Sequence, residues 1–139
     1  MKRKTILFLA ALSILCVIGG AFAWYFTAGR GGFTREMAAL HLPTGVEKIA
    51  VKSGVGDSGG NGDYTTDRVV LMVKTDLPIQ RLKSAPEIQG IVFRGREVSC
   101  SVTPCRGKVF RSDRDFSLTF DGVEAPKDWS GYYFIELIR

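Results

Sequence analysis

The chain has 139 residues, with 19 Lys and Arg, 14 Asp and Glu, three Cys and one His. This length suffices for one ordinary domain and excludes large barrels and multi-domain enzymes. Three of the basic residues stand at positions 2–4, and the other 16 exceed the acidic residues by only two. The basic balance therefore indicates membrane topology, and we expect no nucleic-acid partner.

An uncharged, apolar segment follows the basic start and occupies residues 5–28. A helix of that length spans a hydrocarbon core about 30 Å thick. Basic residues in front of such a segment keep the N-terminus in the cytoplasm. We therefore expect a bacterial cytoplasmic-membrane protein with one membrane span, its N-terminus inside and its domain outside.

Signal-peptide cleavage is the alternative interpretation of this segment. Ala21, Phe22 and Ala23 form an A-x-A site, so cleavage after Ala23 would leave a secreted or periplasmic domain. The Gly19 and Gly20 pair favours cleavage, because it can end the helix before the site. Apolar character that continues to residue 28 favours the anchor, because a cleaved signal is usually followed by polar sequence.

The exported part begins with residues 29–32, which predict a glycine-rich spacer, and residues 33–139 predict one extracytoplasmic domain. A helix is expected over residues 34–41, because Met37 and Leu40 lie at helical spacing. A second short helix is expected from residue 76 to residue 83 or 84.

The remainder of the domain has β patterning. The segment at residues 68–74 is apolar on both faces and is expected to form the central strand. The other strands are expected at residues 46–52, 91–93, 96–102, 108–111, 115–120 and 132–138. The sequence thus predicts an α+β fold: a transmembrane or signal helix, then one small domain with a mainly antiparallel sheet and one or two short helices.

Two cysteines remain after Cys16, which lies in the apolar segment. Cys100 and Cys105 form an even pair in a compartment that permits disulfides. Residues 102–104 predict a turn that brings the two side chains together. We predict a structural disulfide between Cys100 and Cys105, with two buried free thiols as the alternative.

Residues 56–60 spell GDSGG, which resembles the segment around the nucleophile of chymotrypsin-like serine proteases. The resemblance covers five residues and implies an exported small hydrolase that uses Ser58. That chemistry needs a His base and an orienting carboxylate. The one His is His41, the only carboxylates between it and Ser58 are Glu47 and Asp57, and the chain is too short for the two β-barrels of that family. We expect a glycine-rich loop over residues 54–61 and no enzyme, with the Ser58 hydrolase as an alternative.

The same loop resembles part of a calcium-binding loop through Asp57, Asn61 and Asp63. Gly59 and Arg68 stand where two further ligands belong. A calcium-stabilised structural domain is therefore a second alternative, and turns capped by the Asp and Asn side chains are the simpler interpretation. No cofactor is expected.

Two surface features are candidates for binding. Trp129, Tyr132, Tyr133 and Phe134 predict core and rim packing, with a ligand platform as the alternative. Six basic residues gather in the second half and are the binding candidates: Arg94, Arg96, Arg106, Lys108, Arg111 and Arg114. On one face they would contact lipid headgroups or an anionic envelope polymer; otherwise they form a solvated sheet face.

These observations favour a non-enzymatic, membrane-tethered envelope protein that presents a small interaction domain outside the membrane. The expected partners are the membrane, through residues 5–28, and an envelope protein or anionic envelope polymer.

Overall fold

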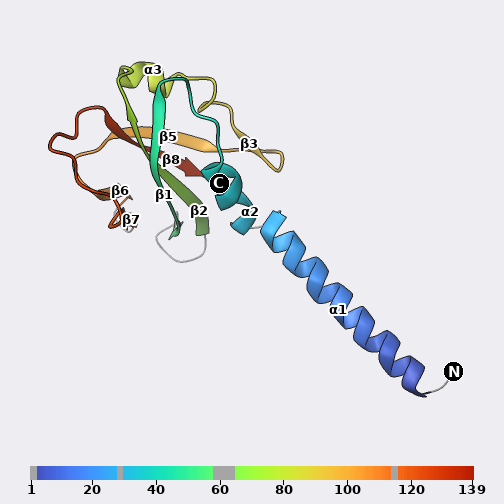
Figure 1. Cartoon of the computed structure of the whole chain (residues 1–139). Helices are drawn as coiled ribbons and strands as arrows, with labels where there is room; N and C mark the ends of the chain where they lie inside the picture. Colours follow the sequence, from blue (N-terminus) through green and yellow to red (C-terminus); the bar gives the residue numbers. More distant parts are fainter. Residues whose placement is uncertain (1–2, 28–29, 58–64, 114–115) are drawn as a thin grey trace. The chain divides into compact units, whose positions relative to one another are not determined.

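The structure is a computed structural model that describes residues 3–27, 30–57, 65–113 and 116–139 (Figure 1). The chain divides into two compact units, Met1–Phe33 and Thr34–Arg139. The first unit consists mainly of one long apolar helix. The second is a small domain with an antiparallel sheet and short helices, so the predicted α+β class is confirmed.

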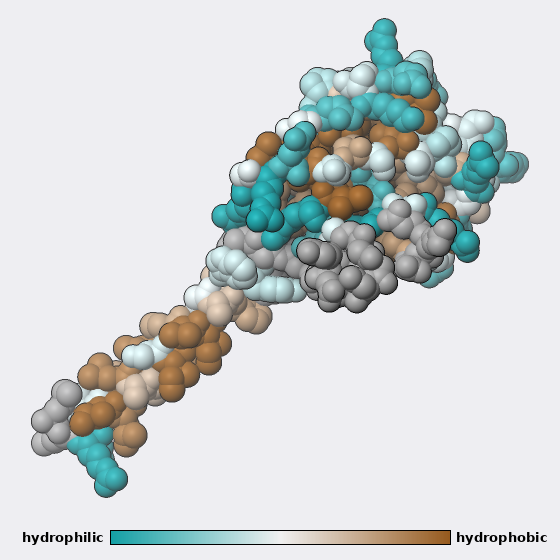
Figure 2. Space-filling model, turned by 180° about the vertical axis from the view of Figure 1, so that it is seen from behind, coloured by the Kyte–Doolittle hydropathy of each residue, from teal (hydrophilic) through white to brown (hydrophobic). Residues whose placement is uncertain are grey.

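Helix α1 runs from Arg3 to Thr27. Its apolar side chains are exposed along its length, and Figure 2 shows them as a largely brown rod. Within the described residues, α1 is the one helix that is long and apolar enough to cross a membrane. A signal sequence passes the same test, so both predicted roles of residues 5–28 are compatible with the fold.

Helix α2 occupies Arg30–Ala38, whereas the sequence predicted a spacer over residues 29–32 and a helix over residues 34–41. The helix begins inside the predicted spacer despite the low helix propensity of its glycines. The helix ends at Ala38, and beyond this end the Lys48 ammonium group donates hydrogen bonds to the carbonyl oxygens of Ala38 and Leu40. A lysine at this position satisfies helix-end carbonyls and lies at the negative end of the helix dipole.

A four-stranded antiparallel sheet forms the framework of the domain. Its strands follow the order β1 (Val46–Asp57), β2 (Thr65–Thr75), β8 (Tyr132–Ile138) and β5 (Ser99–Pro104). Residues 69–73 of β2 are fully buried, since β1 and β8 flank the strand and both faces of the sheet are covered. The prediction of a central strand at residues 68–74 is therefore confirmed.

Short elements complete the domain around the sheet. They are helix α3 (Ile79–Lys83), the β3–β4 hairpin (Val92–Phe93 and Arg96–Glu97) and the β6–β7 hairpin (Val109–Asp113 and Phe116–Thr119). The single strand predicted over residues 96–102 is divided into β4 and β5. The break occurs at Val98, whose backbone N–H donates to the Ile91 carbonyl oxygen at 2.8 Å.

The β6–β7 hairpin packs on one face of the sheet through aromatic side chains. Phe110 lies edge-on to Phe134 of β8, with ring centroids 5.3 Å apart, and Phe120 lies 5.5 Å from the same ring. Val70, Met72 and Phe116 belong to the same buried cluster. Burial of aromatic rings supplies large apolar area, so this layer accounts for a major part of the stability of the domain.

Strand β1 extends further than predicted, since residues 54–57 belong to it and pair with residues 65–68 of β2. The predicted loop over residues 54–61 is therefore wrong in its first four residues. A side chain at Gly54 would bring its Cβ within 3.0 Å of the Phe116 ring. Glycine is present in this strand because the ring of Phe116 packs directly over the backbone.

Candidate functional site

A groove of the described domain lies where β5 ends and β8 begins. We call it the aromatic groove. It has a volume of about 500 Å³. Trp129, Tyr132 and Tyr133 line it, together with Ile79 of α3. The remaining lining residues are Pro104, Cys105, Arg106, Ser130 and Gly131. Aromatic and apolar walls with few polar groups are typical of a binding groove.

The turn before β8 holds the aromatic side chains in place. The Tyr132 N–H donates to the Trp129 carbonyl oxygen at 3.1 Å, and the two rings meet edge to face with centroids 5.5 Å apart. Gly131 has a φ of +79° and its carbonyl oxygen accepts a hydrogen bond from the Thr75 N–H at 2.8 Å. The turn is therefore tied to the end of β2, which gives the aromatic wall a rigid support.

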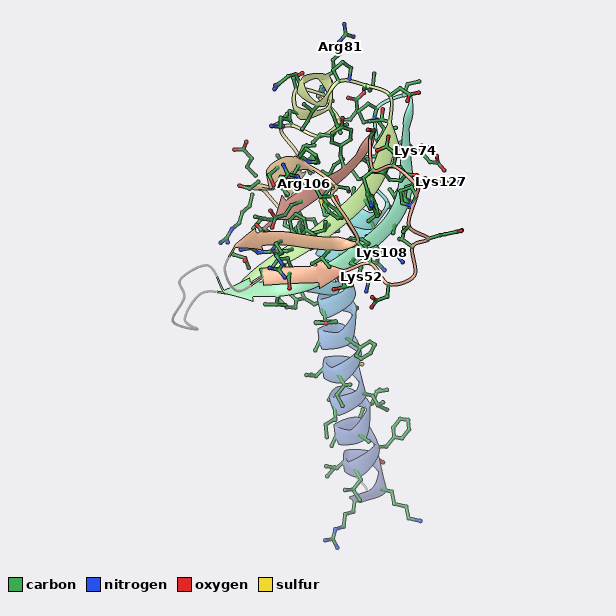
Figure 3. All side chains as sticks on the ribbon, turned by 90° about the vertical axis from the view of Figure 1, so that its left-hand side faces the viewer. Lys52, Lys74, Arg81, Arg106, Lys108 and Lys127 are labelled. Atoms are coloured by element: carbon green, nitrogen blue, oxygen red, sulfur yellow. The ribbon has the colours of Figure 1, made fainter. Side chains whose placement is uncertain are left out.

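Two cations lie at the groove. The Lys74 Nζ lies 5.6 Å from the centre of the Tyr132 ring, and Arg106 is exposed in the groove lining. Figure 3 views this side of the domain and shows Arg106 between Arg81 and Lys108. The nearby Asp128 uses one carboxylate oxygen to cap the Ser130 N–H at 3.0 Å. Among the described lining residues there is no Asp or Glu, so the groove favours anionic ligands.

The predicted basic patch is divided between two ends of the sheet. Arg94 and Arg96 lie in the β3–β4 hairpin, before β5 begins, while Arg106 and Lys108 lie in the turn after β5 ends. Six strand residues separate the two groups, which corresponds to about 20 Å. Figure 1 accordingly shows the β3 hairpin and the β6–β7 hairpin on opposite sides of the domain.

The members of the patch have different surroundings. The Arg94 guanidinium stacks over Phe93, with its carbon 6.0 Å from the ring centre, and Arg111 is exposed on β6. Arg114 lies outside the described residues. The structure thus places Arg106 and Arg111 at one shared cavity, whose described lining does not include Lys108, and separates them from Arg94 and Arg96.

The predicted disulfide is absent from the structure: Cys100 and Cys105 are free thiols. Residues 102–104 continue β5 and do not form the expected turn. Cys100 therefore pairs in register with Leu137, while Cys105 points to the opposite face, into the cluster of Met72 and Phe134. The alternative of two free thiols matches the fold.

Burial makes both thiols weak acids. Desolvation, followed by the negative charge of Glu136, raises the pKa of Cys100 to about 11. Desolvation raises the pKa of Cys105 to about 12. A thiol is a nucleophile only as the thiolate, so Cys105 contributes apolar surface to the aromatic groove and little reactivity.

A buried ion pair on the central strands was not predicted. The Arg68 Nη1 donates to Glu136 Oε1 at 2.8 Å and to Ser112 Oγ at 3.0 Å. Ser112 in turn donates to Glu136 Oε2 at 2.8 Å, and Ser101 donates to the same oxygen at 3.2 Å. The Arg68 guanidinium also lies 4.7 Å from the centre of the Phe116 ring. The polar groups of this network join β2, β5, β6 and β8.

One signal for this network was present in the sequence. Glu136 is the one charged residue within the apolar strand Tyr132–Ile138, and a lone charge at such a position requires a partner. Arg68 lies 68 residues away, so the pairing depends on the neighbouring positions of β2 and β8.

The two motifs of the glycine-rich loop lie mainly outside the described residues. Ser58, Asn61 and Asp63 lie outside the described residues, whereas Asp57 is the last residue of β1. His41, the proposed base of a hydrolase, is exposed after α2. In the described ranges, no three His, Cys, Asp or Glu residues gather in a group that could hold a metal ion.

Comparison with known proteins found no matching family model, no matching curated protein and no matching solved structure.

Proposed function

We propose that this protein is a non-enzymatic, membrane-tethered envelope protein whose domain binds an anionic ligand in the aromatic groove. The observation that carries the proposal is the composition of this groove. Trp129 and Tyr133 offer apolar surface, and Arg106 offers a charged, planar donor beside them. Arginine next to aromatic rings is a common arrangement for binding anionic groups.

The tether is supported by α1, whose uncharged body follows the basic residues at positions 2–4. In this proposal the N-terminus stays in the cytoplasm and the domain faces the outside of a bacterial cytoplasmic membrane. Cleavage after Ala23, which would release the domain, is the competing outcome.

Membrane attachment is tested by expressing the full chain in a bacterium. We expect the protein to remain in the membrane fraction after carbonate extraction, with its domain digested by protease added outside the cytoplasmic membrane. The mass should include residues 1–23. A mature chain that begins at Trp24 would rule out the anchor.

Ligand binding is tested by fluorescence. The chain has two tryptophans, so Trp24→Phe leaves Trp129 as the only tryptophan, which is excited selectively over tyrosine at long wavelength. We expect either hexaglutamate or sodium polyphosphate, added to this full chain in uncharged detergent, to change the emission of Trp129. Arg106→Gln should weaken the response, whereas Lys83→Gln, which removes an exposed cation of α3, should not. No response to either anion would refute the proposed binding function.

A further inference from the structure

Strand β7 lies beside β1, and β6 follows β5 after the turn at residues 105–108. The polar network links β5 and β6 further along, because Ser101 and Ser112 both donate to Glu136. A cavity of about 230 Å³, here called the seam, lies between β5 and β6. Its described lining residues are Thr103, Pro104, Arg106, Val109, Phe110, Arg111 and Phe134. The seam shares Pro104 and Arg106 with the aromatic groove.

Two strand edges meet at the seam. Within the described part of the chain, β5 pairs only with β8, and β6 pairs only with β7. Each strand therefore has one edge that no other described strand covers. An uncovered edge is a template for the backbone of an additional extended chain.

The registers show which backbone groups face the seam. On β6, the Phe120 N–H donates to the Lys108 carbonyl oxygen at 2.8 Å, so alternate residues from Lys108 bond to β7. The N–H and C=O groups of Val109 and Arg111 consequently point the other way. On β5, the Cys105 N–H donates to the Tyr132 carbonyl oxygen at 2.9 Å, so Pro104 points away from β8 and offers its carbonyl oxygen to the seam, although as a proline it has no N–H.

The side chains of the seam combine apolar surface with positive charge. Val109 is 45% exposed although it is a large apolar residue, and the floor is formed by the buried rings of Phe110 and Phe134. Arg106 and Arg111 are exposed at this cavity, and no Asp or Glu occurs among its described lining residues. This arrangement favours a chain that alternates apolar and acidic side chains.

We propose that the ligand is an extended acidic peptide that adds as a β-strand at the seam between β5 and β6. This inference rests on the proposed binding function and specifies its ligand class and binding mode. A peptide fits better than an anionic polysaccharide, because it supplies alternating N–H and C=O groups that match the outward N–H and C=O groups of Val109 and Arg111 on β6 and the outward carbonyl oxygen of Pro104 on β5.

The test uses the full chain with Trp24→Phe in uncharged detergent and a fluorescein-labelled peptide of three Val-Glu repeats. We expect saturable binding by fluorescence anisotropy. Replacing each glutamate of the peptide by lysine should weaken binding at least tenfold, because it reverses the charge that the arginines attract. N-methylation of alternate peptide amides should also weaken binding at least tenfold, because a methylated amide cannot donate a hydrogen bond to the strand edge. The methylated peptide leaves the protein unchanged, so its result does not depend on the folding of a variant.

Matched protein variants test the two components separately. Arg111→Gln should weaken binding of the Val-Glu peptide about fivefold, and the control Lys83→Gln less than twofold. Val109→Pro removes an outward N–H without removing a β6–β7 hydrogen bond, so it should weaken binding more than Val109→Thr. A circular dichroism spectrum unchanged from the parent chain shows that each variant is folded.

The possible outcomes separate the two proposals. If polyphosphate changes the emission of Trp129 but the Val-Glu peptide does not bind, the groove binds anions and strand addition is wrong. Strand addition is also wrong if the methylated peptide binds as tightly as the unmodified one. If neither the peptide nor polyphosphate binds, both proposals fail.

Discussion

Arg68 and Glu136 form an ion pair between the two central strands of the domain, with Nη1 and Oε1 2.8 Å apart and only 4% of each side chain exposed. The pair is bridged by Ser112 of the β6–β7 hairpin, and the guanidinium stacks on Phe116 of the same hairpin. The ion pair therefore links the hairpin to the sheet beside its aromatic contacts, and Ser112 directly follows the seam residue Arg111.

Removal of one partner of this pair should destabilise the domain strongly. Glu136→Gln leaves the Arg68 charge buried without its carboxylate, and we expect a loss of about 3–5 kcal/mol in the free energy of unfolding. Urea denaturation followed by circular dichroism of the full chain in detergent measures this loss. Glu97→Gln, at an exposed position on β4, should change stability by less than about 0.5 kcal/mol.

The double variant Arg68→Met/Glu136→Leu tests the origin of that cost. It removes both charges, so it should be more stable than Glu136→Gln alone. Equal losses in the single and double variants would show that packing, and not the unpaired charge, causes the effect.

Gly54→Ala should destabilise the contact between β1 and the hairpin. Its Cβ would lie 3.0 Å from Cε2 of Phe116, and we expect a loss of about 1–3 kcal/mol because the ring must move. Gly122→Ala is the matched control, since nothing lies within 4 Å of a Cβ at that position. The combination with Phe116→Leu should recover part of the loss if the ring is the obstacle.

Gly131→Ala should destabilise the turn that supports the aromatic groove. The residue has a φ of +79°, and an added Cβ would lie 2.8 Å from the Thr75 carbonyl oxygen. We expect a loss of about 3 kcal/mol, from backbone strain and steric overlap together. Gly90→Ala has a similar φ of +71° and open space around it, so its loss should be about 1 kcal/mol. Similar losses in both variants would mean that the contact with Thr75 has no effect.

The buried thiols should react slowly. In the Cys16→Ser chain at pH 8, Cys100 and Cys105 are protonated, because the pKa values are about 11 and about 12. Iodoacetamide labelling, followed by mass spectrometry, should be much slower for the folded chain than for the chain in urea. Rapid labelling of the folded chain would contradict the burial of these thiols.

The same pKa values give a pH dependence of stability. Above the ordinary thiol pKa of 9.0, the unfolded chain loses the thiol proton while the folded domain retains it. Stability should therefore fall as the pH rises from about 9 towards 11 and 12. Cys100→Ala should show a shallower fall than the parent chain when unfolding is measured across this range.

The amino-acid sequence alone determined the features that depend on local pattern. An uncharged run behind three basic residues predicts helix α1, and alternation of apolar residues predicts the strands, with β8 at the predicted residues 132–138. The apolar run at residues 69–73 predicts a central strand, because only a strand covered on both faces can bury the side chains of both faces. In the structure all five side chains are buried.

The tertiary structure decided which distant residues meet. Strand β5 runs through the expected turn, so it places Cys100 and Cys105 on opposite faces and separates Arg94 from Arg106. The pairing of β2 with β8 brings Arg68 to Glu136, and the packing of Phe116 requires Gly54. These relationships depend on strand order and register, which a one-dimensional pattern leaves open because each strand has two edges and several possible partners.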